Sequence, residues 1–297
     1  MDPALPLDAA RPARDATRLD VGVVAAGRVG AVLGAALARA GHRVVATAAV
    51  SDASRERAAR LLPGVPVRPA DEVARACSLL LLAVPDDALA ALVAGLAETG
   101  ALRPGQLVAH TSGAHGLAVL DPAARLGALP LALHPVLPFA GTDVDLARLA
   151  GACFGVTAPE VLLPVGEVLV LEMGGEPVRV EDALRPLWHA ALAHGANHLV
   201  TLVASAADLL RAAGAPDPAA VLGPLLGAAL DGALRSGDAA LTGPVARGDA
   251  GTVRAHLAVL PEDVRPAYAA LARLPAARAL DSGRLRADQA AGLLEVL

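Results

Sequence analysis

The chain has 297 residues, which is room for two domains and a substantial core. It contains 72 alanines, and all 25 of its basic residues are arginines because no lysine occurs. Schiff bases, catalytic ammonium groups and P-loop phosphate binding all need lysine and are therefore excluded. A net charge of −5 and only four aromatic residues disfavour nucleic-acid binding.

The longest charge-free run covers residues 186–207 and could span a bilayer by its length. It carries histidines, an asparagine and hydroxyl side chains, so we expect a buried helix of a soluble domain and no membrane contact. The first 18 residues mix acids, arginines and prolines without an apolar segment, which predicts a disordered leader and no secretory signal. Cys77 and Cys153 lie in apolar surroundings without metal-type spacing, so we expect reduced core residues of a cytoplasmic protein.

From Leu19 onward, short apolar runs alternate with alanine-rich helical segments. The pattern predicts strands at 19–25, 43–49, 65–67, 78–84, 106–110, 128–134, 153–157 and 177–180. Between them it predicts helices at 30–40, at 54–62 with Ser54 as cap, at 71–76, and from Asp87 with Asp86 as cap. This alternation predicts an α/β fold, a Rossmann-type doubly wound parallel sheet.

Strand signals stop after residue 181. Helices are predicted at 184–213, 218–236, 250–260 and 264–279. We therefore expect a dinucleotide-binding Rossmann domain at 19–181 and an all-helical domain at 182–297, which would bind substrate or dimerise.

A glycine-containing turn joins the first predicted strand to the first helix. Gly27 would let a pyrophosphate approach the backbone, and Gly30 would let helix and strand pack closely. Arg28 and Val29 lie between them at the helix N-terminus, where unpaired N–H groups attract anions. Ala25 replaces the first glycine of the usual G-x-G-x-x-G pattern, which weakens the prediction of a cofactor site against that of a turn kept only for packing.

The end of the second predicted strand bears on the choice between NAD and NADP. An acidic residue there would bind the ribose 2′-hydroxyl of NAD, but residues 46–51 contain none and Asp52 comes late. Side chains able to surround a 2′-phosphate follow instead, namely Ser51, Ser54, Arg55 and Arg57. The sequence favours NADP(H), with NAD as the alternative.

Several segments together resemble one family: AAGRVGAVLGAALARAGHRV, LLLLAVPDDAL, HTSGAHGLAVL, HPVLPFAG, FGVT, PLWHAALAHGANHLVTL and LTGPVARGDAGTVRAHLAVL. They are similar to bacterial Rossmann-like proteins with a characteristic helical C-terminal domain of the DUF2520 type, over residues 20 to about 275. This family lies in the 6-phosphogluconate-dehydrogenase-like superfamily, with pyrroline-5-carboxylate reductase, ketopantoate reductase and coenzyme F420-dependent NADP reductases as relatives. The resemblance implies NAD(P) binding, a substrate cleft and a helical domain that often dimerises; coenzyme F420 is a less favoured cofactor.

Ligands of open α/β sheets bind beyond the carboxyl ends of the strands. That rule selects Val84 and Pro85, then Thr111 and Ser112, which could bind the nicotinamide carboxamide or the substrate. It also selects His134, held extended by the proline that follows it. His134 either belongs to the site or only ties down the chain crossover.

The helix predicted from residue 184 holds further candidates. The resemblance places Arg185 where related dehydrogenases carry a catalytic lysine, and His189 where they carry an asparagine. Arginine stays protonated at neutral pH, so His189 is the better proton donor and Arg185 would bind a substrate carboxylate. Asn197 lies eight residues after His189, close to the same helical face, and we expect it to be catalytic together with His189 and His134. The alternative is a polar stripe that satisfies buried hydrogen bonds between helices.

In the loop 241–249, Thr242 and Arg247 could hold a carboxylate, with Asp249 as the cap of the next helix. Arg247 could equally bridge two helices or subunits. His194 and His198 have i, i+4 spacing but no third ligand is evident, so no metal site is expected.

We therefore expect an NAD(P)H-dependent oxidoreductase that reduces a C=O or C=N bond of a small carboxylate, of the ketopantoate or cyclic imino acid class. We expect a homodimer formed through the helical domain. The alternative is a non-catalytic nucleotide sensor or scaffold, with which the missing lysine, Ala25 and the absent ribose acid all agree.

Overall fold

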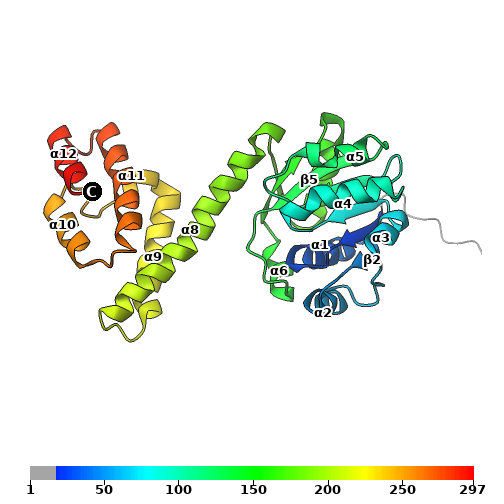
Figure 1. Ribbon diagram of the computed structural model, residues 1–297, viewed down its shortest axis with the longest axis horizontal. Helices are drawn as coiled ribbons and strands as arrows, with labels where there is room; N and C mark the ends of the chain where they lie inside the picture. Colours follow the sequence, from blue (N-terminus) through cyan, green and yellow to red (C-terminus); the bar gives the residue numbers. More distant parts are fainter. Residues whose placement is uncertain (1–17) are drawn as a thin grey trace, which may run out of the picture. The chain divides into compact units, whose positions relative to one another are not determined.

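The computed structural model describes residues 18–297, and the chain divides into two compact units between Gly195 and Ala196 (Figure 1). The first unit contains a sheet flanked by helices, and the second is helical. The predicted leader, apart from Arg18, lies outside the described residues. The sheet-containing unit extends past residue 181, because the first turns of helix α8 (Arg185–Ala212) belong to it.

Seven strands form the sheet in the order β2-β1-β3-β4-β5-β6-β7. Their bounds are β1 (Asp20–Val24), β2 (Arg43–Ala48), β3 (Leu79–Leu82), β4 (Leu107–His110), β5 (Leu129–Pro135), β6 (Cys153–Thr157) and β7 (Glu176–Arg179). The pairing is parallel from β2 to β5, as the apolar runs predict. It departs from the expected all-parallel sheet at β6, which is antiparallel to β5, while β7 is again parallel to β6.

Helices cover both faces of the sheet and bury two separate cores (Figure 1). On one face lie α1 (Arg28–Arg39), α2 (Asp52–Leu61) and α7 (Leu163–Glu172), and on the other α3 (Ala70–Ala76), α4 (Asp86–Glu98) and α5 (Asp121–Ala124). The short helix α6 (Asp143–Arg148) lies in the connection from β5 to β6. Two-sided coverage explains why strands such as β3, with sequence LLLL, are buried on both faces.

Three local expectations were wrong. Ser51, not Ser54, caps α2, because the Ser51 hydroxyl accepts the Ser54 backbone N–H. Pro85 occupies the cap position of α4, so Asp86 lies in the first turn. Its negative charge there still interacts favourably with the positive N-terminal end of the helix dipole. The strand expected at 65–67 is reduced to an isolated bridge between Val67 and Thr47, because this segment is too short for a ladder.

The helical unit contains the rest of α8 with α9 (Pro218–Ser236), α10 (Ala250–Val259), α11 (Arg265–Asp281) and the unpredicted α12 (Ala287–Val296). Asp249 caps α10 as expected, by accepting the Thr252 backbone N–H. The expectation that α8 is buried was wrong: Arg185 is its only fully buried residue. None of the helices in the described residues is both long enough and apolar enough to cross a membrane.

The turn between β1 and α1 contains a strained residue. Among the described residues Ala25 is the only non-glycine with a left-handed backbone, at φ +73°. This conformation costs an alanine about 1–2 kcal/mol, and glycine adopts it without that cost. Ala25 stands where the usual fingerprint has its first glycine. The turn therefore has the left-handed backbone typical of glycine at a position occupied by alanine.

We expect Ala25→Gly to raise the free energy of unfolding by roughly 0.5–1 kcal/mol, because it removes this strain. Urea unfolding followed by circular dichroism measures the change. Ala38→Gly on the exposed side of α1 is the matched control, and should lower the stability by roughly 0.5–1 kcal/mol. A loss of stability in both variants would contradict the strain at Ala25.

Candidate functional site

The N-terminus of α1 is open to an anion. Gly27 occupies the cap position, and no side chain of the described residues caps this end. A methyl group built on Gly27 would meet only the Ala25 carbonyl oxygen, at 4.0 Å, so the space above the backbone is open. A methyl group on Gly30 would lie 2.2 Å from the same oxygen, so Gly30 serves close packing. The two glycines therefore have the separate roles that a dinucleotide turn requires.

The region after β2 carries the side chains expected around a 2′-phosphate. Ser51 and Ser54 hydrogen-bond each other at the start of α2, and Arg55 forms an exposed ion pair with Asp52. Arg57 reaches the turn itself, where its Nη1 donates to the Ala26 carbonyl oxygen at 3.3 Å. Arg57 therefore contacts the backbone of the glycine turn directly.

The loop between β5 and α6 also reaches the turn, which the sequence did not reveal. Arg60 donates to the Gly141 carbonyl oxygen at 2.7 Å. A methyl group built on Gly141 would lie 2.5 Å from Nε of Arg57 and 2.8 Å from Cγ of Arg28. Three arginines thus surround one loop beside an open helix N-terminus, an arrangement that fits the phosphates of a dinucleotide.

Residues after β3 and β4 lie at the carboxyl edge of the parallel strands, as predicted. Val84 and Pro85 lead into α4. Ser112 is buried, and its hydroxyl oxygen accepts the backbone N–H groups of Ala114 and His115, so it organises its own loop. Its predicted contact with a cofactor stays a prediction.

Arg185 at the start of α8 is fully buried. Its guanidinium donates to the carbonyl oxygens of Ser112 and His115, both at 2.5 Å, and to the Thr157 hydroxyl at 3.0 Å. Burial lowers its pKa to about 10, against the opposing effect of Asp182 and Asp86, so it stays charged at neutral pH. With the guanidinium enclosed by protein acceptors, Arg185 holds the loop after β4 and does not present itself to a substrate carboxylate. This arrangement replaces the substrate-binding role expected from the sequence.

His134 and His189 lie together at this edge of the sheet. Their rings meet edge to face with centroids 5.8 Å apart. A methyl group on Gly113 would lie 2.8 Å from Nε2 of His134 and 2.7 Å from Cδ2 of His189, so the missing side chain makes room for both rings. The structure therefore brings together two of the residues predicted to be catalytic.

The sequence did not single out Trp188, although it belongs to the same cluster. It follows Arg185 by three residues, which puts both on one face of α8. Its indole N–H donates to Nδ1 of His134 at 3.2 Å. Trp188 is the only tryptophan of the sequence and directly precedes the candidate His189, and this signal could have identified it.

A buried histidine also supports the loop. His110, at the end of β4, is fully buried, and its Nε2 lies 3.1 Å from the Gly116 carbonyl oxygen. Burial, with a smaller effect of the Arg185 charge, lowers its pKa to about 4. His110 is therefore uncharged at neutral pH.

Of the other residues singled out from the sequence, His194 belongs to the sheet-containing unit, and Asn197, His198, Thr242 and Arg247 belong to the helical unit. Asn197 is exposed on α8, and Arg247 and Thr242 are exposed and joined by a hydrogen bond from the guanidinium to the Thr242 carbonyl oxygen. His194 and His198 are exposed one turn apart on α8. Among the described residues, no group of three histidine, cysteine or acidic side chains is arranged to hold a metal ion.

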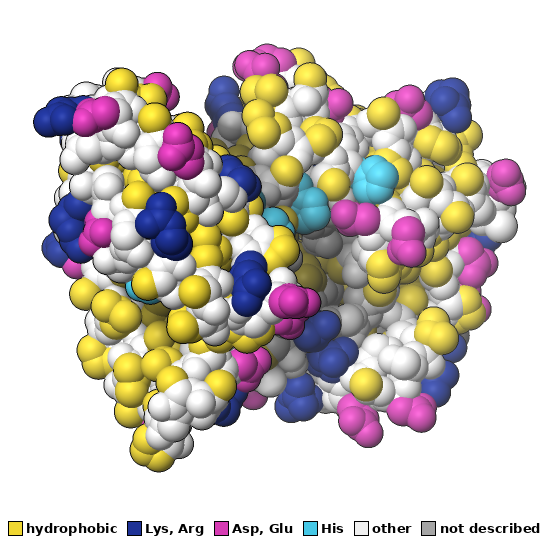
Figure 2. All heavy atoms as spheres, turned by 60° about the vertical axis from the view of Figure 1, so that its left-hand side comes forward, with side chains coloured by type: hydrophobic (Ala, Val, Ile, Leu, Met, Phe, Trp, Pro, Cys, Tyr) yellow, Lys and Arg dark blue, Asp and Glu magenta, His cyan; other side chains and the backbone are white. Residues whose placement is uncertain are grey.

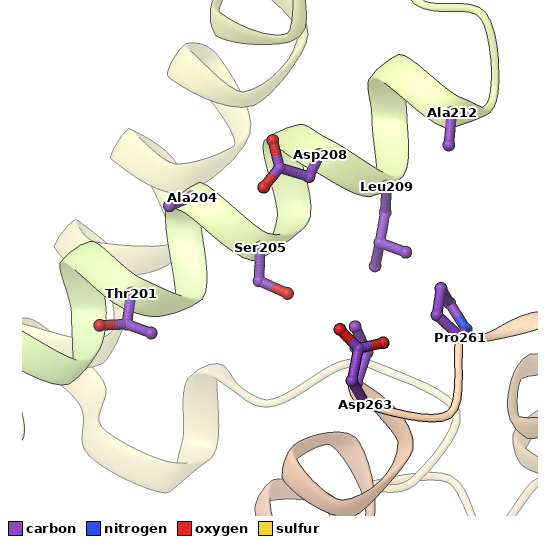
Figure 3. A pocket seen from close by; sticks show the side chains of 9 residues that line it. Thr201, Ala204, Ser205, Asp208, Leu209, Ala212, Pro261 and Asp263 are labelled. Carbon is purple, nitrogen blue, oxygen red and sulfur yellow. The ribbon is translucent and has the colours of Figure 1, made fainter.

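A pocket of about 490 Å³ lies in the helical unit between α8 and the segment that precedes α11 (Figure 3). Its polar lining includes Thr201, Ser205, Asp208 and Asp263. Asp208 is already paired with Arg211 at 2.5 Å. None of the predicted site residues lines this pocket, so it does not enlarge the candidate site.

Both parts of the chain match known protein domains. Residues 8–135 match the Rossmann-like domain, and residues 152–274 match the domain of unknown function DUF2520. None of the functionally curated proteins searched matches the chain.

Solved structures share the fold at low identity. A candidate NADP oxidoreductase from Bacteroides fragilis is 22% identical, with a TM-score of 0.74 over 87% of this chain and 98% of that one. A protein from Thermotoga maritima is 17% identical, with a TM-score of 0.62 over 89% of this chain and 100% of that one. Pyrroline carboxylate reductase from Plasmodium falciparum, solved with NADP bound, is 11% identical, with a TM-score of 0.53 over 93% and 98%.

The two domain matches follow each other along the chain, separated by residues 136–151, and together they cover the strands of the sheet and most of the helical region. The fold agrees with them, and its structural relatives include nicotinamide-dependent oxidoreductases. The chain therefore consists of a Rossmann-like domain followed by a DUF2520 domain.

Proposed function

We propose that this protein is an NADP(H)-dependent oxidoreductase that reduces a C=O or C=N bond of a small carboxylate. The observation that carries the proposal is the open N-terminus of α1 at Gly27, with Arg28 and Arg57 beside it and a histidine pair at the carboxyl edge of the same sheet. When bound, NADPH supplies the hydride, and the protein supplies orientation and one proton.

The preference for NADP(H) rests on charge. No acidic side chain lies at residues 46–51 to bind a ribose 2′-hydroxyl, whereas Arg57 and Arg60 approach the turn and the neighbouring loop. A guanidinium pairs well with a phosphate dianion. NAD(H) lacks that phosphate and should gain less from these side chains.

His189 is the proposed proton donor. The hydride adds to the carbon of the double bond, and the proton from His189 adds to its oxygen or nitrogen, which gives the alcohol or amine. His189 is only half-buried, so it can exchange its proton with water between turnovers. Asn197, Thr242 and Arg247 lie in the helical unit, and their expected contacts with the substrate stay predictions.

A non-catalytic sensor or scaffold is the competing function. One of its arguments loses force, because Ala25 adopts the conformation of the glycine that it replaces. The missing lysine still agrees with it. Measurements of cofactor binding and of turnover decide between the oxidoreductase and the scaffold.

We expect NADPH at about 100 times its Kd to stabilise the protein by about 2.7 kcal/mol, and to raise its melting temperature more than NADH at equal concentration. Arg57→Ala should weaken NADPH binding about 10-fold and leave NADH binding nearly unchanged. Arg75→Ala, a surface arginine paired with Asp71 on α3, is the control. Equal or tighter binding of NADH by the unmodified protein would overturn the NADP preference, and no shift with either cofactor would favour the scaffold.

We expect His189→Ala to lower kcat about 100-fold or more in reduction of α-keto and imino acids, followed by NADPH absorbance. The affinity for NADPH should stay within about twofold, because His189 is assigned to the proton and not to the phosphates. Unchanged turnover would remove His189 from the mechanism.

We also propose that the protein is a homodimer formed through its helical unit. Large apolar side chains are unusually exposed on α8 and α9, with Val200 71%, Leu225 64% and Leu234 80% exposed. Figure 2 shows hydrophobic side chains spread over the viewed surface of this unit. Apolar surface of this kind in a soluble chain typically marks a protein interface, and a second copy would bury it.

Light scattering after gel filtration should give the mass of two chains at micromolar concentration. Leu225→Glu with Leu234→Glu should shift the mass toward one chain, because burying two carboxylates in an apolar interface is unfavourable. Val161→Glu, an equally exposed position in the sheet-containing unit, should have no effect. A monomeric unmodified protein would contradict the dimer.

A further inference from the structure

The contact between Trp188 and His134 determines which ring nitrogen of His134 carries the proton. The Trp188 indole nitrogen donates to Nδ1 of His134 at 3.2 Å. An indole nitrogen bears a hydrogen and cannot accept a hydrogen bond. Nδ1 must therefore be the unprotonated acceptor, which places the proton of the neutral ring on Nε2.

Two glycines make this contact possible. Gly155 on β6 is the residue paired with His134 across the antiparallel β5–β6 ladder. A methyl group on Gly155 would lie 3.0 Å from the indole nitrogen of Trp188, and one on Gly113 would lie 2.8 Å from Nε2 of His134. Gly155 thus leaves space for the indole on one side of the imidazole. Gly113, in the loop after β4, leaves space beside Nε2 on the other side.

Burial, more than the surrounding charges, keeps His134 neutral. Burial lowers its pKa to about 4, and the positive charges of Arg185 and His189 act in the same direction, while Asp86 opposes them. At neutral pH the ring is an uncharged N–H donor. Its Nε2 makes no hydrogen bond within the described part of the chain, and it lies at the carboxyl edge of β5, where open α/β sheets bind ligands.

We propose that Trp188 is a positioning residue that fixes His134 as the Nε2–H tautomer, and that this N–H is a neutral hydrogen-bond donor to the carbonyl oxygen of the substrate. The second part rests on the proposed oxidoreductase function. It narrows the substrate from C=O or C=N to C=O, because a carbonyl oxygen has lone pairs to accept the N–H and a protonated imine has none. Developing negative charge on that oxygen during hydride addition strengthens the bond.

Nitrogen NMR of the ligand-free protein labelled with ¹⁵N-histidine tests the tautomer without cofactor or substrate. His134→Gln identifies the His134 signals by their loss. From pH 5 to 8 we expect Nε2 to remain in the range of a protonated ring nitrogen and Nδ1 in that of an unprotonated one. Trp188→Phe, which keeps an aromatic ring but removes the donor, should average the two signals. Leu187→Ala, an exposed neighbour on α8, should change neither.

Gly155→Ala provides a second variant, because it displaces the indole while it leaves both Trp188 and His134 in the sequence. It should cause the same averaging. A protonated Nδ1 in the unmodified protein, or an unchanged tautomer in folded Trp188→Phe and Gly155→Ala, would overturn the assignment.

Kinetics test the donor. Trp188→Phe should lower kcat for a carbonyl substrate about 10-fold or more, with the KM for NADPH unchanged, because a wrong tautomer removes the donor and leaves the cofactor site intact. Cyclic imines should have a lower kcat/KM than α-keto acids in the unmodified protein. A preference for imines would overturn the donor role of His134. No turnover of either class would refute the donor role together with the proposed function, while the NMR result would still decide the tautomer.

Discussion

The candidate site depends on one buried cation. The guanidinium of Arg185 is enclosed by the loop after β4 and by Thr157 at the end of β6, and it donates to two backbone carbonyl oxygens and one hydroxyl. A buried charge of this kind is tolerated only when its donors are satisfied. The bonds therefore fix the start of α8 against two strands that are far apart in sequence. Asp182 adds to this by accepting the Leu117 N–H at 2.6 Å, so both ends of the loop 112–117 are held from the α8 side.

The position of the two histidines follows from this anchor. Once Arg185 is fixed, helical spacing places Trp188 and His189 one turn further along the same face, against His134 and Gly113. The charge that anchors the helix also lowers the pKa of His134. Burial of the ring is the larger cause of that lowered pKa, so the enclosed position of His134 and the Arg185 charge act together to keep it neutral. Arg185, which the family resemblance aligns with a lysine of related dehydrogenases, is a buried structural cation here, and the proposed proton chemistry is assigned to His189.

Much of the fold could be predicted from sequence because its signals are local. Apolar runs such as residues 79–82 are typical of buried parallel strands, and the glycines at 27 and 30 mark the first turn. Boundaries at α2 and α4 were missed by one to three residues, because several serines and acids in a row can each act as cap. The antiparallel β6 could not be read, since an apolar strand has the same pattern in either direction. The exposure of α8 was also not predicted, because its alanines and leucines are equally typical of a helix buried within its own chain and of one at a protein interface.

The sequence by itself determined the fold class and the position of the glycine turn, and from residue types it predicted a class of chemistry. Without lysine, and with Gly27 at a strand-to-helix turn, it pointed to a nucleotide cofactor and to histidine as the proton donor, because these are properties of residue type and short spacing. Only the tertiary structure decided the roles of individual side chains. It buried Arg185, placed Arg60 and Gly141 beside the turn, and set Gly155 opposite His134 to admit Trp188. These roles depend on distances between segments about 20 to 80 residues apart in the chain. Strand pairing and helix packing fix such distances, and local sequence patterns do not contain them.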